Sequence, residues 1–265
     1  MKTTIYYFSA TGNSLQMARN IAKELDNCEL ISIAKAIQKE TIETPSERIG
    51  LIFPVYAWGI PRIVKDFVMK LGLNGKSYVF AIATCVAIPG NTLLDLQRLL
   101  KQKGADLNAG FVVSAGCSSL MNLNVLDKII VRLDRQRKKI KNGESRLIEI
   151  VTTLKNLEMH RPESSSWAAN SFGSIFHNMA LKSFKTTDSG FIIKDTCNGC
   201  GNCTKVCPRS NITIENNRPI FYHNCELCHA CIQWCPNFAI QHPNFNITLQ
   251  QYHNPAILMS DIIAK

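Results

Sequence analysis

The feature that most constrains this chain is a cysteine pattern that occurs twice near the carboxyl end. Each copy reads C-x2-C-x2-C-x3-C and is followed at once by a proline. The two copies comprise Cys197, Cys200, Cys203 and Cys207, then Cys225, Cys228, Cys231 and Cys235. A [4Fe-4S] cluster needs four soft thiolates, and this spacing places three of them around one short turn. The repeat therefore predicts two [4Fe-4S] clusters.

The ligands divide between the clusters in a crossed manner. In runs of this kind the fourth cysteine ligates the other cluster. The first cluster is therefore assigned Cys197, Cys200, Cys203 and Cys235. The second cluster is assigned Cys225, Cys228, Cys231 and Cys207. Such clusters predict a protein that moves electrons one at a time.

Two other uses of cysteine fit the sequence less well. Zinc ribbons use two cysteine pairs for each metal, whereas here a triplet followed by Cys-Pro occurs twice without a defect. A disulfide framework is typical of secreted proteins. A signal peptide has a basic region, a long apolar run and a cleavage site after small residues. The amino-terminal residues MKTTIYYFSATGNS lack these features. A reducing, cytoplasmic location in an anaerobe is expected.

The amino-terminal residues predict a strand, a phosphate loop and a helix. Residues 3–8 form a short apolar run, and helical periodicity begins near residue 13. Between them lies S-A-T-G-N-S, residues 9–14, which is rich in hydroxyl groups. Backbone amides and the positive end of a helix dipole make such a turn a site for a phosphate. The loop lacks the lysine of a nucleotide-hydrolysing P-loop and the three glycines of a dinucleotide fold.

Two later loops each follow a strand-like segment. Residues 54–61 (PVYAWGIP) come after the segment 49–53, and residues 84–91 (TCVAIPGN) come after the segment 78–83. An aromatic side chain, Tyr56 or Trp58, could stack on a flat ring, and glycine allows close approach of the backbone.

The phosphate loop and these two later loops resemble the FMN site of flavodoxins. The resemblance implies that FMN binds here, with the two later loops on either side of its ring system. The implied FMN residues are Ser9, Thr11, Gly12, Asn13, Ser14, Pro54, Tyr56, Ala57, Trp58, Gly59, Thr84, Cys85, Gly90 and Asn91.

Alternating strand and helix patterns predict an α/β fold. Strands are expected at residues 3–8, 29–33, 49–53, 78–83 and 110–114, and helices at about 13–25, 61–71 and 91–103, with a further helix ending the domain. The expected fold is a flavodoxin-like, doubly wound parallel five-stranded sheet of order 2-1-3-4-5.

The cysteine-rich segment resembles a bacterial two-cluster ferredoxin, a small α+β domain. Each half supplies a strand, a cluster loop, a short helix and a second strand. The whole chain thus resembles the anaerobe fusions of a flavodoxin-like domain with such a ferredoxin. The expected divisions are an FMN-binding domain (1–160), a linker helix (161–189), a ferredoxin domain (190–245) and a carboxyl-terminal tail (246–265).

The chain is basic, with a formal net charge of +10. Residues 125–146 are especially basic and show helical apolar spacing. They predict an amphipathic helix with a solvated basic face, and the alternative is a docking surface for an acidic redox partner. We expect no nucleic-acid binding, because no groove-reading motif is present. We also expect no membrane span, because no apolar stretch approaches the required length of about 20 residues.

The sequence therefore predicts an electron-transfer protein in which single electrons pass between two [4Fe-4S] clusters and FMN, and on to a redox partner. The alternative is an enzyme, an FMN-dependent reductase of a small substrate fed by the clusters. No residue is singled out as catalytic, and an electron carrier is the preferred interpretation.

Overall fold

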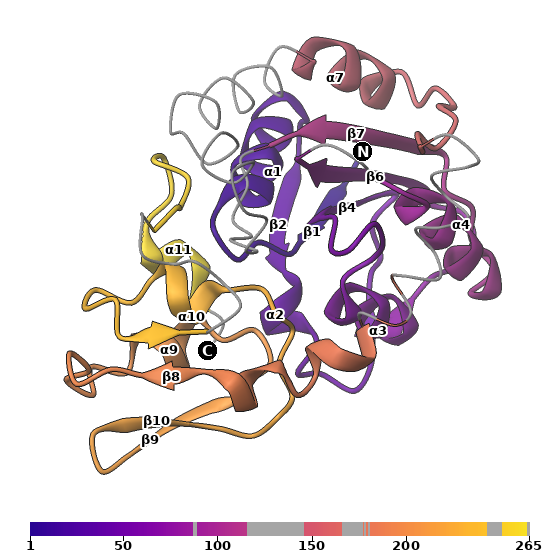
Figure 1. The fold of residues 1–265 in the computed structure, drawn as a ribbon. Helices are drawn as coiled ribbons and strands as arrows, with labels where there is room; N and C mark the ends of the chain where they lie inside the picture. Colours follow the sequence, from indigo (N-terminus) through magenta and orange to yellow (C-terminus); the bar gives the residue numbers. More distant parts are fainter. Residues whose placement is uncertain are drawn as a thin grey trace.

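The computed structural model describes residues 1–86, 89–115, 146–165, 177, 179, 181–242 and 251–263. Its largest element is a parallel sheet of five strands, drawn at the centre of Figure 1. The strands are β1 (Thr3–Tyr7), β2 (Cys28–Ser32), β4 (Arg48–Pro54), β6 (Tyr78–Cys85) and β7 (Ala109–Ser114), in the order β2-β1-β4-β6-β7.

Helices cover both faces of this sheet. One face packs against α1 (Asn13–Glu24) and α7 (Leu147–Lys155), and the other against α2 (Ile33–Ala36), α3 (Arg62–Lys70) and α4 (Thr92–Gln102). Burial on both faces explains why the central strands are nearly continuous apolar runs. All eight residues of β6 are buried, for example.

The predicted fold class is confirmed. The five strands and the three predicted helices each lie within about two residues of their expected bounds. By element number the order differs from 2-1-3-4-5, because the structure adds two short strands, β3 (Ile42–Glu43) and β5 (Leu71–Gly72), which pair only with each other. When these two are set aside, the order is the expected one.

The cysteine-rich unit, here residues 190–242, is small and repeats itself. It contains β8 (Ile192–Ile193), α9 (Asn202–Val206), β9 (Ile212–Glu215), β10 (Arg218–Phe221), α10 (Ala230–Gln233) and β11 (Ile240–Gln241). β9 pairs with β10 and β8 pairs with β11, both antiparallel. Its own apolar core holds only a few residues around Ile212, Ile232 and Ile240. A core of this size gives little stability by itself, so the unit depends on contacts beyond its own core.

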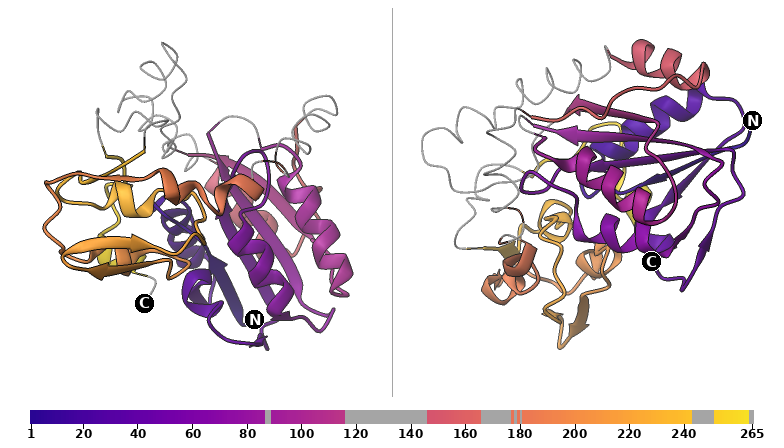
Figure 2. Two further views of the ribbon diagram at one scale, coloured as in Figure 1. Left: turned by 60° about the horizontal axis from the view of Figure 1, so that its bottom comes forward. Right: turned by 90° about the vertical axis from the view of Figure 1, so that its right-hand side faces the viewer.

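The cysteine-rich unit and the carboxyl-terminal tail pack against the α/β unit. Figure 1 and the left view of Figure 2 place them, in orange and yellow, beside the indigo β1–α1 end of the sheet, away from α4. Val206, Cys228 and Ala230 of the cysteine-rich unit belong to the same core cluster as the residues beneath α3. The tail adds Ile257 and, from α11 (Met259–Ile262), Ile262. The interface is thus an extension of the main core.

Two predicted segments lie wholly or largely outside the described residues. They are the basic segment 125–146, of which only Arg146 is described, and the part of the linker helix between residues 166 and 176. The linker ends in a 3-10 helix, η1 (Thr187–Gly190). None of the described helices combines the length and the apolar character needed to cross a bilayer.

Candidate redox centre

The first set of cysteines surrounds a pocket in the cysteine-rich unit. Cys197, Cys200, Cys203 and Cys235 all line it, although Cys235 is distant in sequence from the other three. The remaining lining is mostly small or apolar. Cys200 is exposed, whereas Cys203 and Cys235 are buried. The crossed ligand set predicted for the first cluster is therefore brought together at one place, with one side toward solvent.

The second set lies deeper and against the α/β unit. Electrostatic interactions connect the members of this set, which are Cys207, Cys225, Cys228 and Cys231. Cys228 is also part of the main core cluster. Burial raises the pKa of the Cys225 thiol to about 12 and those of Cys228 and Cys231 well above the ordinary value. These thiols are neutral without metal at neutral pH. Binding iron must therefore release protons.

The ten described cysteines are all free thiols. Among the described residues, no three His, Cys, Asp or Glu side chains converge on a position for one shared ion. A four-iron cube does not require such convergence, because each of its four thiolates binds a different iron.

The predicted phosphate loop lies between β1 and α1. Gly12 has a left-handed backbone with φ of 99°, which glycine adopts without strain. Its amide donates to Oγ of Ser9 at 3.1 Å. The first backbone bond of α1 runs from Gln16 N–H to Gly12 O, so the amides of the first helical turn are left for other acceptors. The Ser14 hydroxyl is buried and bonded to Thr84 Oγ1 at 2.8 Å, which ties the loop to the end of β6.

The outer side of this loop is held by two distant segments. The indole N–H of Trp234 donates to Ala10 O at 2.8 Å, and the Asn254 N–H donates to Thr11 O at 2.7 Å. The Tyr252 hydroxyl donates to Oδ1 of Asn13 at 2.8 Å. Since the carbonyl groups of residues 10 and 11 face these donors, the cysteine-rich unit and the tail fix the direction of the loop backbone.

The loop 54–61 is a tight turn with strained backbone. Tyr56 and Gly59 exchange two backbone hydrogen bonds of 3.0 Å, which closes a two-residue hairpin. Ala57 and Trp58, at its tip, both have positive φ, 45° and 62°. Non-glycine residues adopt this region at a cost of about 1–2 kcal/mol each. Strain of this kind is concentrated at functional sites.

The loops 54–61 and 84–91 touch each other. A Cβ on Gly90 would lie 2.8 Å from the Cβ of Trp58, and φ of Gly90 is 60°. Only glycine fits there. His177, from the linker, covers Gly59 and places Nδ1 3.2 Å from the carbonyl oxygens of both Tyr56 and Ala57.

A buried ionic cluster joins helix α3 to the second cysteine set. Glu226, between Cys225 and Cys228 in the sequence, has a side chain only 2% exposed. Its Oε1 accepts the Ile63 N–H at 3.0 Å, and its Oε2 accepts Nε of Arg209 at 2.7 Å. The Nε of Arg62 lies 3.6 Å away. Arg62 also donates to the Asn224 and Cys225 carbonyl oxygens.

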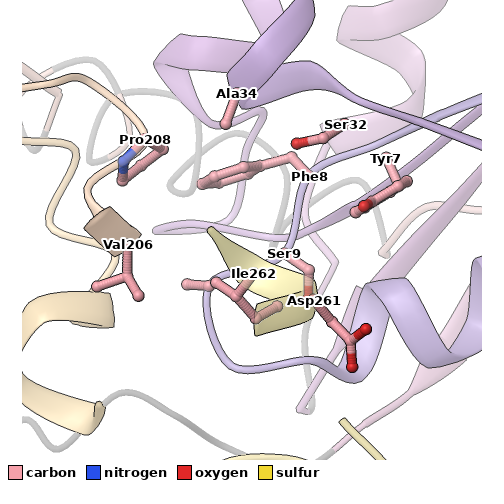
Figure 3. A pocket seen from close by; sticks show the side chains of 10 residues that line it. Tyr7, Phe8, Ser9, Ser32, Ala34, Val206, Pro208, Asp261 and Ile262 are labelled. Atoms are coloured by element: carbon pink, nitrogen blue, oxygen red, sulfur yellow. The ribbon is translucent and has the colours of Figure 1, made fainter. Parts of the chain in front are cut away.

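A pocket opens where the loop after β1 meets the other two parts of the molecule (Figure 3). Figure 3 shows Phe8 and Ser9 on one side, Val206 and Pro208 of the cysteine-rich unit on another, and Ile262 of α11 between them. Ser32 and Ala34 also line it, so it lies on the β2 side of β1. It is separate from the loops 54–61 and 84–91.

The structure thus gathers the predicted FMN residues into two groups, residues 9–14 and the pair of later loops, linked by Ser14 and Thr84. Cys85 is buried at the end of β6, and Pro54 ends β4. Sequence reasoning missed the contacts of Glu226, Arg62, His177, Tyr252 and Asn254. The sequence contained one indication of the role of Glu226, since it is a charged residue within the second cysteine loop. It contained no indication of the contacts made by the tail.

Comparison with protein families assigns both parts of the chain. A flavodoxin domain model matches residues 4–145, more than half of the chain, and a 4Fe-4S dicluster domain model matches residues 190–236. The chain therefore belongs to the flavodoxin domain family and carries a 4Fe-4S dicluster domain after it. This combination supports electron transfer by flavin and iron–sulfur groups. The comparison with curated proteins gives no match.

Several solved flavoprotein structures are distantly similar to this chain. A flavoprotein from Bacteroides uniformis is 20% identical, with 43% of this chain and 90% of that chain covered and a TM-score of 0.36. A Streptococcus pneumoniae flavodoxin is 15% identical over 55% and 99% of the two chains, with a TM-score of 0.34. A two-electron reduced Megasphaera elsdenii flavodoxin is 17% identical over 55% and 98%, with a TM-score of 0.33.

Proposed function

We propose that this protein passes single electrons between two [4Fe-4S] clusters and one bound FMN, and on to a redox partner protein. One observation carries the proposal. Tyr56 of the candidate ring loop packs against the core cluster that contains Cys228 of the second cysteine set, and Cys228 is near enough to act on Tyr56 electrostatically. In this proposal the FMN-binding domain comprises residues 1–160, and the domain that holds the clusters comprises residues 190–245. A linker helix (161–189) joins the two domains, and residues 246–265 form a tail.

The residues suit FMN at both of its ends. The amides of the first turn of α1, with the hydroxyl groups of Ser9 and Thr11, would hold the phosphate. The strained turn 56–59 and Gly90 would hold the ring system, which accepts one or two electrons when bound. Pro54, Thr84, Cys85 and Asn91 complete these two loops.

The cysteine sets give the electron path an outer and an inner end. Cys200 of the first set is exposed, so a partner protein would meet that set first. Cys207 and Cys228 of the second set are buried, and Cys228 contacts the core of the α/β unit. A chain of centres that runs from the surface to the flavin site suits a carrier.

The proposal is tested by anaerobic iron, sulfide and flavin analysis of the purified protein, with visible spectra recorded during stepwise reduction. We expect iron and sulfide for two four-iron clusters, one FMN per chain, and changes in both the cluster and the flavin absorbance. Zinc in place of iron, or a protein that binds no FMN, would refute the proposal. Flavin reoxidation that depends on a small substrate would instead indicate a reductase.

A further inference from the structure

A segment of the tail, residues 251–257, lies on the outer side of the candidate phosphate loop and is here called the strap. Its residues Tyr252, Asn254 and Ile257 are buried. A Cβ added to Gly12 would lie 2.8 Å from the Ile257 Cβ and 3.0 Å from the Asn254 Cβ. The strap therefore packs directly on the loop backbone at Gly12.

The strap is also attached to the cysteine-rich unit. The Tyr252 N–H donates to Oε1 of Gln233, in α10, at 2.7 Å. The His253 ring stacks on the Trp234 ring, with centroids 4.3 Å apart and 11° between the ring planes. These contacts fix the strap relative to α10 while its other side holds the loop.

The direction of the loop's peptide groups follows from these neighbours. A trans peptide places its C=O and its N–H on opposite sides. Because the Ala10 carbonyl faces the Trp234 indole, the Thr11 N–H points away from it, and this N–H forms no hydrogen bond with any described residue. The Thr11 carbonyl faces the Asn254 N–H in the same way, so the Gly12 N–H points away from the strap.

The strap orients the Asn13 side chain as well. The Oδ1 of Asn13 accepts the Tyr252 hydroxyl at 2.8 Å and Nδ2 of Asn254 at 3.2 Å. Two donors at this oxygen place the donor nitrogen of the Asn13 amide on the opposite edge. The strap thus binds acceptor atoms of the loop and turns donor groups away from itself. Donor groups gathered in this way at the start of a helix bind anions.

We propose that Tyr252 and Asn254 are positioning residues for the FMN phosphate. They act through the loop, because their bonds to the Thr11 carbonyl and to Oδ1 of Asn13 keep the loop's donors directed at the phosphate. The inference rests on the proposed function, since it requires FMN at this loop. It makes the tail, which has no motif of its own, a part of the flavin site.

A strap that only held the molecule together would behave differently. Riboflavin has the ring system of FMN but lacks the phosphate group, so it separates the two roles. Loss of a positioning residue weakens the binding of FMN alone, whereas a general loosening of the fold weakens the binding of both flavins alike.

The test is Tyr252→Phe in the full chain with its iron–sulfur groups present and its flavin removed. Tyr78→Phe is the matched control, because the Tyr78 hydroxyl donates to the Glu158 carbonyl oxygen at 2.6 Å, at the start of β6 and thus at the opposite end of the sheet. Anaerobic titration with FMN and with riboflavin gives the two dissociation constants. Hydrogen exchange of residues 9–14 is measured on the flavin-free protein.

A second variant tests the strap's other side chain. Asn254→Asp keeps the oxygen that accepts the Ala256 N–H at 3.0 Å, but it replaces the donor nitrogen by an acceptor that faces Oδ1 of Asn13. It also adds a negative charge near the proposed phosphate position. We therefore expect a larger effect on FMN than in Tyr252→Phe, about tenfold or more in the dissociation constant.

We expect Tyr252→Phe to raise the FMN dissociation constant about threefold to tenfold, as for one lost hydrogen bond, and to leave that of riboflavin unchanged. Residues 9–14 should exchange faster in this variant, and Tyr78→Phe should match the wild type throughout. Unchanged FMN affinity in both strap variants, or an equal loss for both flavins, would overturn this inference alone. A wild-type protein that binds no FMN would overturn the proposed function and the inference with it.

Discussion

At the scale of single residues, backbone conformation defines the candidate phosphate loop and the candidate ring loops. Gly12 and Gly90 occupy positions where an added Cβ would meet Ile257 or Trp58. Ala57 and Trp58 adopt the left-handed region without being glycine. The first pair was recognisable from the sequence, because glycine in such loops has a physical reason. The second pair was not, since neither alanine nor tryptophan indicates a positive φ.

Gly12→Ala should loosen the phosphate loop. The new Cβ would combine the strain of a φ of 99° with an approach of 2.8 Å to the Ile257 Cβ. Gly104→Ala is the matched control, because φ there is 75° but nothing lies within 4 Å. We expect the control to cost about 1 kcal/mol from strain alone. Gly12→Ala should in addition lose FMN on dialysis and expose residues 251–263 to protease. Equal behaviour of the two variants would contradict this account of the loop.

His177 should make the loop 54–61 sensitive to pH. Burial lowers its pKa below the ordinary value, while the carbonyl oxygens of Ala57 and Tyr56 and the charge of Asp95 oppose the shift and Lys65 adds to it. Because the folded-state pKa is depressed, its stabilisation is present above a pH of about 6.5 and is lost as the pH falls.

The hydrogen-exchange rate of residues 54–61, corrected for intrinsic rates, should therefore rise as the pH falls from about 7.5 to about 5.5. His177→Gln should show a flatter profile. His160→Gln serves as the control, because the His160 ring packs at a tilt against Phe111, with centroids 4.2 Å apart, in another part of the molecule. This variant should keep the wild-type rise. An identical profile for wild type and His177→Gln would show that His177 has no part in the effect.

At the scale of elements, the amino terminus of α3 forms a polar connection between the two units. The Ile63 amide donates to Glu226, and the Arg62 side chain donates to Asn224 and to the Cys225 carbonyl oxygen. A carboxylate at a helix amino terminus also interacts favourably with the helix dipole. The sequence predicted α3 but not this use of it, because partners far apart in the chain leave no local pattern.

Glu226→Gln should weaken this connection strongly. It leaves the largely buried Arg209, only 11% exposed, without its inner carboxylate. Breaking a buried ion pair costs about 3–5 kcal/mol. Asp66→Asn removes the outer partner of the same arginine, a carboxylate that is 47% exposed, and should cost less than about 1 kcal/mol.

Hydrogen exchange at the Ile63 amide reports the difference. We expect an acceleration of roughly a hundredfold to several thousandfold in Glu226→Gln and little change in Asp66→Asn. Slow exchange in both variants would mean that the units are held together by apolar packing alone.

The conformation of the tail and the positions of the shortest elements could not be predicted from the sequence. α11 has four residues and β3 and β5 have two each, which is too few for periodicity to show. Their positions depend on tertiary contacts, such as the bond between Asn254 N–H and Thr11 O. By contrast, β6 and α1 were predictable because a buried parallel strand and an amphipathic helix each carry a clear pattern.

At the scale of the whole molecule, the chain packs the second cysteine set against the same core cluster as the candidate ring loop. The sequence predicted both sites from local motifs, and it predicted the crossed ligand sets from the repeat. It could not predict that the second set faces the α/β unit while Cys200 of the first faces solvent. That arrangement is the one that the proposed electron exchange within one chain requires.

The most direct test of the account is the rate of electron exchange between clusters and flavin after rapid anaerobic mixing with a one-electron reductant. Absorbance of the clusters and of FMN is followed at several protein concentrations. We predict that FMN is reduced by the clusters of the same chain, with a rate that does not depend on protein concentration. A rate proportional to protein concentration, or clusters that stay reduced beside oxidised flavin, would contradict the account.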